Sequence, residues 1–233
     1  MANRLKGFSR DIWIADGGPV TAAAGFHYPT RMAVIRLKDG LFIWSPVRLD
    51  DALRAELATL GEVAHLVAPN SLHHVFLGEW QMAFPSARTY LAPGLREKRR
   101  DLRFDHELSD APVPEWGGDI DQVVVHGNAI TAEVVFFHRP SGTVLFTDLL
   151  QNFPRGWFRG WRGLVARLDL MLEREPSVPR KFRLAFTGKN AARAAIRRIL
   201  AWPAEKVLMA HGEPVVTDAP AYLRRAFRWL GVP

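Results

Sequence analysis

The sequence predicts an α/β protein in which helices cover the faces of β-sheets. Apolar segments of strand length alternate with segments whose apolar residues recur at helical spacing. Short turn signals join several of the strand-like segments into hairpins. The chain has 233 residues, 48% of them hydrophobic, with no internal repeat and no long Gly/Ser linker, so we expect one domain over residues 1–233. This alternation favours sheets covered by helices.

The first predicted hairpin joins Arg31–Leu37 to Leu41–Ser45 through a Lys-Asp-Gly turn, whose glycine suits the positive φ of tight turns. A Ser-Pro pair ends the second strand. Leu49–Gly61 is predicted as a helix, because it has acidic residues near its start, apolar residues at helical spacing and a glycine at its end. Val63–Ala68 is a short apolar strand.

Further elements follow in the same alternating order. A helix is expected around Phe76–Phe84, then the strand Ala87–Ala92, and Leu95–Trp116 is expected to be irregular because of its prolines. Three strands are predicted next: QVVVHG, AEVVFFH and TVLFTD. The remaining segments are the helices GWRGLVARLDLMLE and NAARAAIRRILAW, the strand KVLMAHG and the helix AYLRRAFRWLG.

Composition excludes several classes of site and compartment. The chain has no cysteine, so it cannot form a disulfide or a thiolate metal site, and any metal must be held by nitrogen and oxygen ligands. The first residues contain charges and no long apolar run, unlike a signal peptide. No window approaches the roughly 20 apolar residues of a membrane span. We therefore expect a cytoplasmic protein without a membrane partner.

The net charge of +7 raises the question of a nucleic-acid partner. The densest basic patch is Leu95–Phe104, and Glu97 and Asp101 interrupt it. The basic residues farther along the chain are mixed with acids, Trp and Leu at helical spacing. These patterns are more typical of solvated surfaces. We therefore rank nucleic-acid binding behind the two functions discussed below.

Titratable residues follow three of the predicted strands. His73 and His74 lie in the stretch LVAPNSLHHVFLGEW, Asp148 follows TVLF, and His211 follows KVLMA. Open α/β sheets usually place ligands at the carboxyl ends of their strands. Taken singly, each histidine could be a hydrogen-bonded packing residue and the aspartate a helix cap. The histidines at 27, 65, 106, 126 and 138 are assigned no role.

Aromatic residues are dense in the segment Asn152–Trp161. Trp157 and Trp161 lie four residues apart, which is typical of a helix face in contact with a core. We expect Trp161 in the core, whereas Phe153 and Trp157 could equally form the wall of a cleft near Asp148.

The order of these motifs resembles the metallo-β-lactamase superfamily. That superfamily has H-x-H-x-D-H after an early strand, then a middle histidine, an aspartate in an LFTGD-like stretch and a late histidine before glycine. TVLFTDLLQNF and VLMAHG are the strongest matches. DIWIADGG and RLKDGLFIWSPVRLD look similar to a divergent branch with P-N-x-x-H-H in place of the first motif. The resemblance spans nearly the whole chain and implies a four-layer αββα sandwich with two mostly antiparallel sheets.

The resemblance also implies a ligand set. His74 falls on the last histidine of the first motif and His73 on its aspartate, while Asp148 matches the metal-bridging aspartate and His211 the final histidine. In the superfamily these positions hold one of two metal ions. Consecutive residues of a turn point about 100° apart, so His73 and His74 would reach one ion only through different ring nitrogens.

Departures from the family pattern fall on the other metal position. Pro69 and Ser71 stand where the first two motif histidines would be, and Ala129 lies near the place of the middle histidine. The alignment is loose by one or two residues there, so His126 is the alternative, although we expect it, with His65 and His138, to lie outside the site. The resemblance therefore implies a single-metal site.

The implied site is His73, His74, Asp148 and His211 around one divalent ion. Zn²⁺ is the first candidate and Fe²⁺ or Mn²⁺ are alternatives, because imidazoles and a carboxylate suit these ions. Asp148 would act as a ligand or as a catalytic base. Asn70 either supports a ligand or is only a turn residue.

Two classes of function remain open at this point. One is a metal-dependent hydrolase acting on the ester, amide or thioester bond of a small molecule, as the resemblance implies. The other is a non-catalytic binding module on a degenerate fold, in which the four residues form a hydrogen-bonded cluster without metal. A nucleic-acid partner ranks third.

Overall fold

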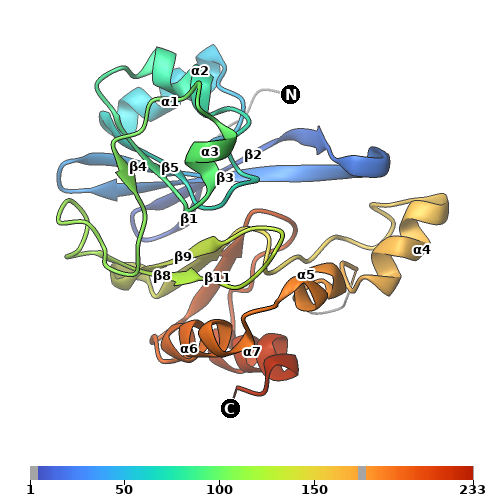
Figure 1. The fold of residues 1–233 in the computed structure, drawn as a ribbon. Coiled ribbons are helices and arrows are strands. Elements are labelled where there is room, and N and C mark those ends of the chain that lie inside the picture. Colours follow the sequence, from blue (N-terminus) through green and yellow to red (C-terminus); the bar gives the residue numbers. More distant parts are fainter. Residues whose placement is uncertain (1–4, 173–176, 233) are drawn as a thin grey trace.

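Two β-sheets lie face to face in the computed structural model, which describes residues 5–172 and 177–232 (Figure 1). Helices α1 (Asp51–Leu60), α2 (Leu77–Ala83) and α3 (Leu95–Lys98) cover the outer face of the larger sheet. Helices α6 (Lys189–Leu200) and α7 (Ala219–Phe227) cover the outer face of the smaller sheet. The predicted four-layer arrangement of helices, sheet, sheet and helices is confirmed.

The larger sheet has seven strands in chain order, and its two halves differ in direction. Its strands are β1 (Lys6–Ser9), β2 (Ile12–Thr21), β3 (His27–Leu37), β4 (Gly40–Trp44), β5 (Val63–Ala68), β6 (Arg88–Leu91) and β7 (His106–Glu107). Strands β1 to β4 pair antiparallel, whereas β4 to β7 pair parallel. Helices α1 and α2 provide crossovers between parallel strands. The expectation of mostly antiparallel sheets is therefore wrong for the second half of this sheet.

The smaller sheet has the order β11-β10-β9-β8. Its strands are β8 (Ile120–Val125), β9 (Glu133–His138), β10 (Thr143–Phe146) and β11 (Lys206–Met209). Strand β10 pairs parallel with β11 and antiparallel with β9. Because β10 and β11 run in the same direction, their carboxyl ends, and the residues after them, reach the same edge of the sandwich.

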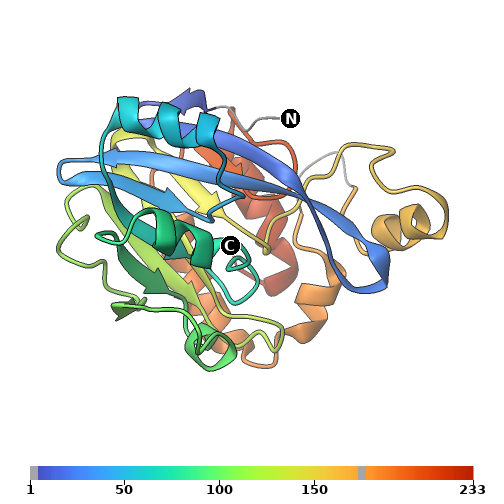
Figure 2. The same cartoon turned by 90° about the horizontal axis from the view of Figure 1, so that it is seen from above.

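Shorter elements surround the sandwich. They are α4 (Gly160–Leu168), α5 (Arg180–Ala185) and the 3₁₀ turns η1 (Ala23–Gly25), η2 (Arg139–Ser141) and η3 (Arg228–Leu230). Helix α4 stands beside the sandwich, at the same end as the tip of the β2–β3 hairpin, in both views (Figures 1 and 2). None of the helices in the described part of the chain has the length and apolar character needed to cross a bilayer.

Alternating side chains of the strands build separate apolar layers. Phe42 and Val67 of the larger sheet meet Phe136 and Leu145 of the smaller sheet in the layer between them. Leu66, next to Val67, faces α1 and α2 instead. The period of two that defines a strand therefore supplies both the inter-sheet core and the helix-covered face.

Most predicted elements are present, and one predicted helix is shorter than expected. Strand β1 was not predicted, and α3 and β7 lie in the segment Leu95–Trp116, which was expected to be irregular. Strand β2 was not predicted, because Gly17, Gly18 and Pro19 interrupt its apolar pattern, and its register shifts between Gly17 and Val20. Helix α5 was also missed. The helix predicted over Gly160–Glu173 ends at Leu168 in α4, Leu170 has a left-handed φ of 62°, and Glu173 lies outside the described residues.

Candidate metal centre

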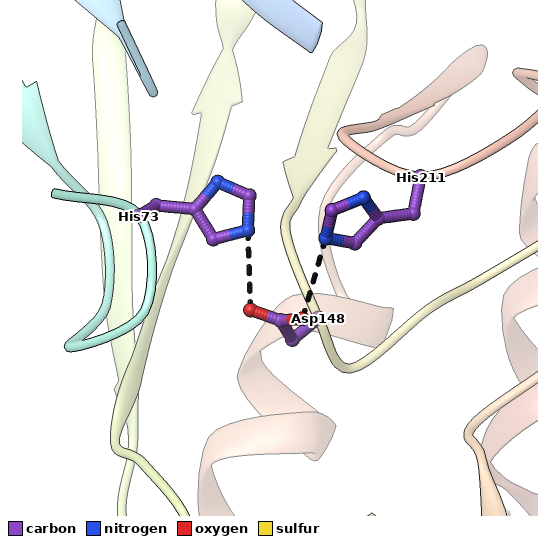
Figure 3. Close-up of side chains that lie close together, drawn as sticks. All are labelled: His73, Asp148 and His211. Atoms are coloured by element: carbon purple, nitrogen blue, oxygen red, sulfur yellow. Dashed lines mark ion pairs between the residues drawn. The ribbon is translucent and has the colours of Figure 1, made fainter. Parts of the chain in front are cut away.

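Three titratable side chains from separate parts of the sequence meet at one edge of the sandwich. His73 follows β5, Asp148 follows β10 and His211 follows β11 (Figure 3). The Nε2 atom of His73 lies 3.2 Å from Oδ2 of Asp148, and Nε2 of His211 lies 3.4 Å from Oδ1. One ligand atom from each residue lies within 4.8 Å of the others. The arrangement can hold one metal ion.

The loop after β5 directs His73 into this cluster through Asn70. The Oδ1 atom of Asn70 accepts hydrogen bonds from the backbone N–H of Leu72 at 2.9 Å and of His73 at 3.0 Å, which closes a local turn. The Nδ1 atom of His73 lies 2.7 Å from Oγ of Ser45. Ser45 has a left-handed φ of 54°, a strained conformation of the kind that clusters at functional sites.

His211 is oriented by the opposite hairpin and by an aromatic ring. Its Nδ1 atom donates to the carbonyl of Pro29 at 2.7 Å, and its ring stacks on Phe153 at 6.1 Å with an angle of 11°. Gly212 follows with a φ of 103°, and a Cβ there would lie 1.9 Å from the carbonyl oxygen of Asn152. Only glycine can follow His211 in this backbone path, which explains the His-Gly motif.

The backbone around Asp148 is held by a buried carboxylate. The two oxygens of Glu133 accept from the N–H groups of Thr147 at 2.8 Å, Asp148 at 2.8 Å and Leu149 at 3.1 Å. Glu133 begins β9 and is fully buried. Three hydrogen bonds from consecutive backbone N–H groups leave the turn after β10 little freedom.

Asn70 also connects the loop after β5 to the aspartate. Its Nδ2 atom lies 2.7 Å from Oδ2 of Asp148, 2.8 Å from Oγ1 of Thr147 and 3.4 Å from Oε2 of Glu133. The buried amide of Asn70 therefore acts at both ends. Its oxygen positions the backbone of His73, and its nitrogen positions the carboxylate of Asp148. Asn70 therefore closes the turn and also bonds to Asp148, so it is more than a turn residue.

Burial and charge determine protonation in this group. Burial alone raises the pKa of Asp148, but the charges and hydrogen bonds of His73 and His211 lower that pKa well below its usual range. Burial lowers the pKa of His73, against the opposing effect of Asp148. Burial and the negative charge of Asp148 raise the pKa of Glu133 to about 7, against the hydrogen bonds from Thr147 and Asp148. The group therefore contains an ionised Asp148 carboxylate beside the His73 imidazole, which resists protonation.

His74 does not join the cluster, which corrects the expected four-residue set to three. Its Nδ1 atom accepts a hydrogen bond from Nη1 of Arg99 at 2.8 Å. Burial and the charges of Lys98 and Arg99 lower the pKa of His74 to about 4. Consecutive side chains in a turn point in different directions, and here the second ring turns toward α3 and Arg99 instead of toward Asp148.

The positions that depart from the family pattern offer no ligands for a second ion. Oγ of Ser71 lies 2.9 Å from Oγ1 of Thr131, and Ala129 is exposed. His126 is exposed after β8 and does not belong to the cluster. His65 and His138 are buried elsewhere in the structure. Within residues 5–172 and 177–232, the cluster of His73, Asp148 and His211 is the single group with metal-ligating geometry.

A cavity of about 780 Å³ opens beside the cluster. His73, Asp148 and His211 form part of its lining, together with mostly apolar side chains from the β2–β3 hairpin, the loop after β5 and α4. This volume is in the range of small-molecule sites, roughly 300–1,000 Å³. The predicted small-molecule substrate would have room next to the three polar residues.

Three residues that organise the site were not identified from the sequence. Glu133 carried a signal, since a charged residue begins an otherwise apolar strand. Ser45 was noted only as a strand end. Arg31 donates to the carbonyl of Met209 at 3.1 Å and to that of Gly212, and pairs with Asp16 at 2.7 Å. It braces the turn that carries His211, and no local pattern indicates this.

Solved structures with the metallo-β-lactamase fold resemble this one over almost the full chain. A metallo-β-lactamase from Pontibacter korlensis aligns with a TM-score of 0.66, 12% identity and 99% coverage of both chains. FIM-1 from Pseudomonas aeruginosa, in its mono-zinc form, aligns with a TM-score of 0.64 and 12% identity, covering 100% of this chain and 98% of its own. The Flv1 flavodiiron core from Synechocystis aligns with a TM-score of 0.65 and 11% identity, covering 98% and 61%. At such identities the likeness shows the fold.

Sequence comparison places the chain more narrowly. No curated protein matches the sequence significantly. Residues 12–159 match the family described as "Domain of unknown function (DUF4336)", and they include β2 to β10, His73 and Asp148. The chain belongs to this DUF4336 family and has the fold of the metallo-β-lactamases.

Proposed function

We propose that this protein is a metal-dependent hydrolase whose single divalent ion is held by His73, Asp148 and His211. The observation that carries the proposal is the hydrogen bond from His211 to Pro29. A carbonyl oxygen can only accept, so Nδ1 of His211 carries its proton. Nε2 is then the ring nitrogen that faces the carboxylate of Asp148, 3.4 Å away, and it is the nitrogen that can bind a cation there. A cation between these two electron-rich atoms would stabilise both.

The donor set suits a catalytic ion. Two imidazole nitrogens and one carboxylate oxygen match catalytic zinc sites, which have three protein ligands and leave one position open. The same set is found around non-haem Fe²⁺, so iron and manganese remain alternatives to zinc. His211 donates its Nδ1–H to the backbone carbonyl of Pro29. Metal-binding histidines commonly donate their other ring N–H to a carbonyl in this way. A bound divalent ion would polarise a carbonyl oxygen and lower the pKa of water to roughly 7.

The surrounding residues would keep the three ligands in place during turnover. The Oγ atom of Ser45 bonds to Nδ1 of His73, and the carbonyl of Pro29 bonds to Nδ1 of His211, which leaves Nε2 of each ring facing Asp148. Asn70 and Glu133 hold the carboxylate and the backbone of Asp148. Because Ser45, Asn70 and Glu133 are buried, the side chains they hold are oriented before an ion or a substrate binds, which reduces the cost of reorganisation.

The relatives support a single ion and hydrolytic chemistry. The structures that share the fold include enzymes named metallo-β-lactamases, and one of them, FIM-1, is described in a mono-zinc form. A one-zinc state is thus compatible with this fold. The cavity beside the cluster is large enough for a small organic ester, amide or thioester.

Hydrolysis by zinc-loaded protein tests the proposal. Protein stripped with a chelator and titrated with Zn²⁺, Fe²⁺ or Mn²⁺ in a calorimeter should bind one ion per chain. The loaded protein should then hydrolyse 4-nitrophenyl acetate or acetyl thioesters, and Asp148→Asn should abolish binding and turnover. His126→Ala is the matched control, because His126 is exposed and outside the cluster.

Two results would separate the alternatives. Stoichiometric zinc without turnover of any ester, amide or thioester would support the non-catalytic binding module. Failure to bind any of the three ions would show that the cluster is a hydrogen-bonded polar group and would overturn the proposal.

A further inference from the structure

An exposed apolar stripe on α4 adjoins the cavity. Trp161, Leu164, Val165 and Leu168 follow the i, i+3, i+4, i+7 pattern of one helix face, and they are 55%, 61%, 42% and 57% exposed. A helix of a globular protein normally buries such a face. Trp161 was expected in the core, and its exposure corrects that expectation.

The opposite side of α4 makes the contacts that fix the helix. Ala166 is fully buried in a small cluster with Phe26, Phe153 and Phe158. Nε of Arg162 donates to the carbonyl of Ala24 at 2.9 Å. Within the stripe itself, Trp161 meets Phe26 edge to face at 5.8 Å and is still 55% exposed. The helix is therefore docked mainly by its other face, and the apolar stripe stays largely exposed.

The stripe and the cavity share residues. Val165 and Leu168 line the cavity, and both are exposed. The loops across the opening contribute three more exposed apolar side chains to the lining, Leu72, Val75 and Ile130. Contiguous exposed apolar surface of this kind marks a ligand groove or an interaction site. Continuity with the cavity favours a ligand that extends from the cluster outward along α4.

The few charged residues of the cavity lining limit the chemical class of that ligand. Apart from the cluster, the charged residues of the described lining are Asp169 and Lys181, and they pair with each other at 3.4 Å. A ligand portion outside the cluster therefore meets no unpaired charge in this part of the structure. Sugars and nucleotides would find few polar partners there, whereas a hydrocarbon chain would lose water-exposed surface at every methylene.

Beside the cluster, the cavity lining has one polar side chain, Gln151, that could bind a polar end of the same ligand. Gln151 is fully buried, and within the described residues neither its amide oxygen nor its amide nitrogen has a hydrogen-bond partner. Gln151 lies three positions after Asp148 on the same turn. A carbonyl-containing group near the cluster could use this amide, because buried polar groups are seldom left unpaired.

We propose that the cavity and the stripe of α4 bind the long apolar chain of an acyl ester or thioester. The reacting carbonyl would lie at His73, Asp148 and His211, and the hydrocarbon chain would lie between Val165, Leu168 and the loop after β5. The cleaved bond rests on the proposed hydrolase function, but binding of the chain does not require a metal ion.

Chain-length dependence tests the proposal in two arms. In the first, alkan-1-ols from butanol to decanol are titrated into metal-free protein by calorimetry, with Trp fluorescence as a second readout. Affinity should rise about fourfold for each added methylene, which corresponds to ~0.8 kcal/mol per buried CH₂. In the second, kcat/KM of zinc-loaded protein should rise from 4-nitrophenyl butanoate to the decanoate.

Leu168→Glu and Leu184→Glu form a matched pair of variants. Both leucines are exposed helix residues, at 57% and 84%, so both variants should fold, but only Leu168 lines the cavity. Leu168→Glu should weaken decanol binding by about tenfold, because a charge enters an apolar site. Leu184→Glu should leave that affinity unchanged.

The outcomes distinguish this proposal from the hydrolase function. An alkanol affinity that does not change with chain length, or equal effects of the two glutamate variants, would overturn the acyl-chain site. Ester hydrolysis without chain-length dependence would support the hydrolase function and contradict the proposed acyl-chain site. Chain-length-dependent alkanol binding by a protein that binds no metal would retain the apolar site and reject the hydrolase.

Discussion

His65 and His73 belong to one continuous segment, strand β5 and the loop after it, yet their rings lie in opposite environments. His65 lies in the layer between the sheets, with Tyr90 at 5.6 Å and Trp116 at 5.5 Å, and in the described structure neither ring nitrogen has a hydrogen-bond partner. Both ring nitrogens of His73 have partners, Ser45 at 2.7 Å and Asp148 at 3.2 Å.

Burial lowers the pKa of both histidines, so burial alone does not mark a metal site. The difference lies in what faces the rings. His65 is surrounded by aromatic carbon, whereas His73 points at a carboxylate that a second histidine also approaches. A buried imidazole is a candidate ligand when its free nitrogen converges with other donors, and a core residue when it does not.

The largest effect should separate the two adjacent histidines. His73→Ala removes one of the three proposed ligands, and we expect loss of stoichiometric metal, a larger effect than the roughly 10–100-fold typical of losing a supporting partner. His74→Ala should retain metal, because the His74 ring pairs with Arg99. Elemental analysis of both variants, purified side by side, measures the difference. Equal metal content in the two would contradict the three-residue site.

Asn70→Ala should have the next largest effect. Removing the amide deprives Asp148 and the backbone of His73 of their hydrogen bonds, so zinc affinity should fall by roughly 10–100-fold. Competition with a chromogenic chelator measures that affinity. Ser71→Ala is the control from the same loop, since Ser71 bonds to Thr131 and not to the cluster. If both variants bind zinc as the wild type does, Asn70 does not position the ligands.

His65→Phe tests the core side of the comparison through pH. Burial lowers the pKa of His65 in the folded protein below its ordinary value of 6.5. As the pH falls below 6.5, the unfolded chain binds a proton at this position and the folded protein does not. Stability should therefore decline with falling pH until the lowered folded-state pKa is reached, by up to about 1.4 kcal/mol per pH unit.

The phenylalanine variant should lose this part of the pH dependence. It should also be more stable at pH 7 by about 1 kcal/mol or more, because an unpaired buried polar group is replaced by an apolar ring. Urea unfolding at several pH values measures both effects. Metal content should stay at the wild-type level. An unchanged slope of stability against pH would mean that His65 becomes protonated in the folded protein.

The smallest effect should come from two serines that each bond to a histidine. Ser45→Ala removes the partner of Nδ1 of His73, and Ser141→Ala removes the partner of Nδ1 of His138 at 2.8 Å. Each hydrogen bond is worth about 1 kcal/mol. Ser45→Ala should weaken zinc binding about fivefold, while Ser141→Ala should change only the free energy of unfolding. Zinc titration and urea unfolding of both variants measure these effects. A loss of zinc affinity in Ser141→Ala as large as in Ser45→Ala would contradict the expectation.

The difference between these regions also shows where sequence patterns are informative. The strand periods of β5, β10 and β11, the turn chemistry of the Pro-Asn-Ser stretch and the His-Gly pair are local, and they placed His73, Asp148 and His211 after strand ends. His65 and His138 were left outside the site on the same grounds, and neither belongs to the cluster of His73, Asp148 and His211. Strand β2 was missed because glycines and a proline hide its period.

The sequence by itself determined the α/β class, and its motif order indicated the αββα sandwich and the candidates for one metal site. Hydrophobic period and turn residues act over a few positions, so they can be read along the chain. Only the tertiary structure decided that His74 turns to Arg99, that Glu133 and Arg31 brace the turns of Asp148 and His211, and that the apolar stripe of α4 stays uncovered. These contacts join residues that are distant in the chain, and their geometry depends on how the two sheets and the loops around them pack in three dimensions.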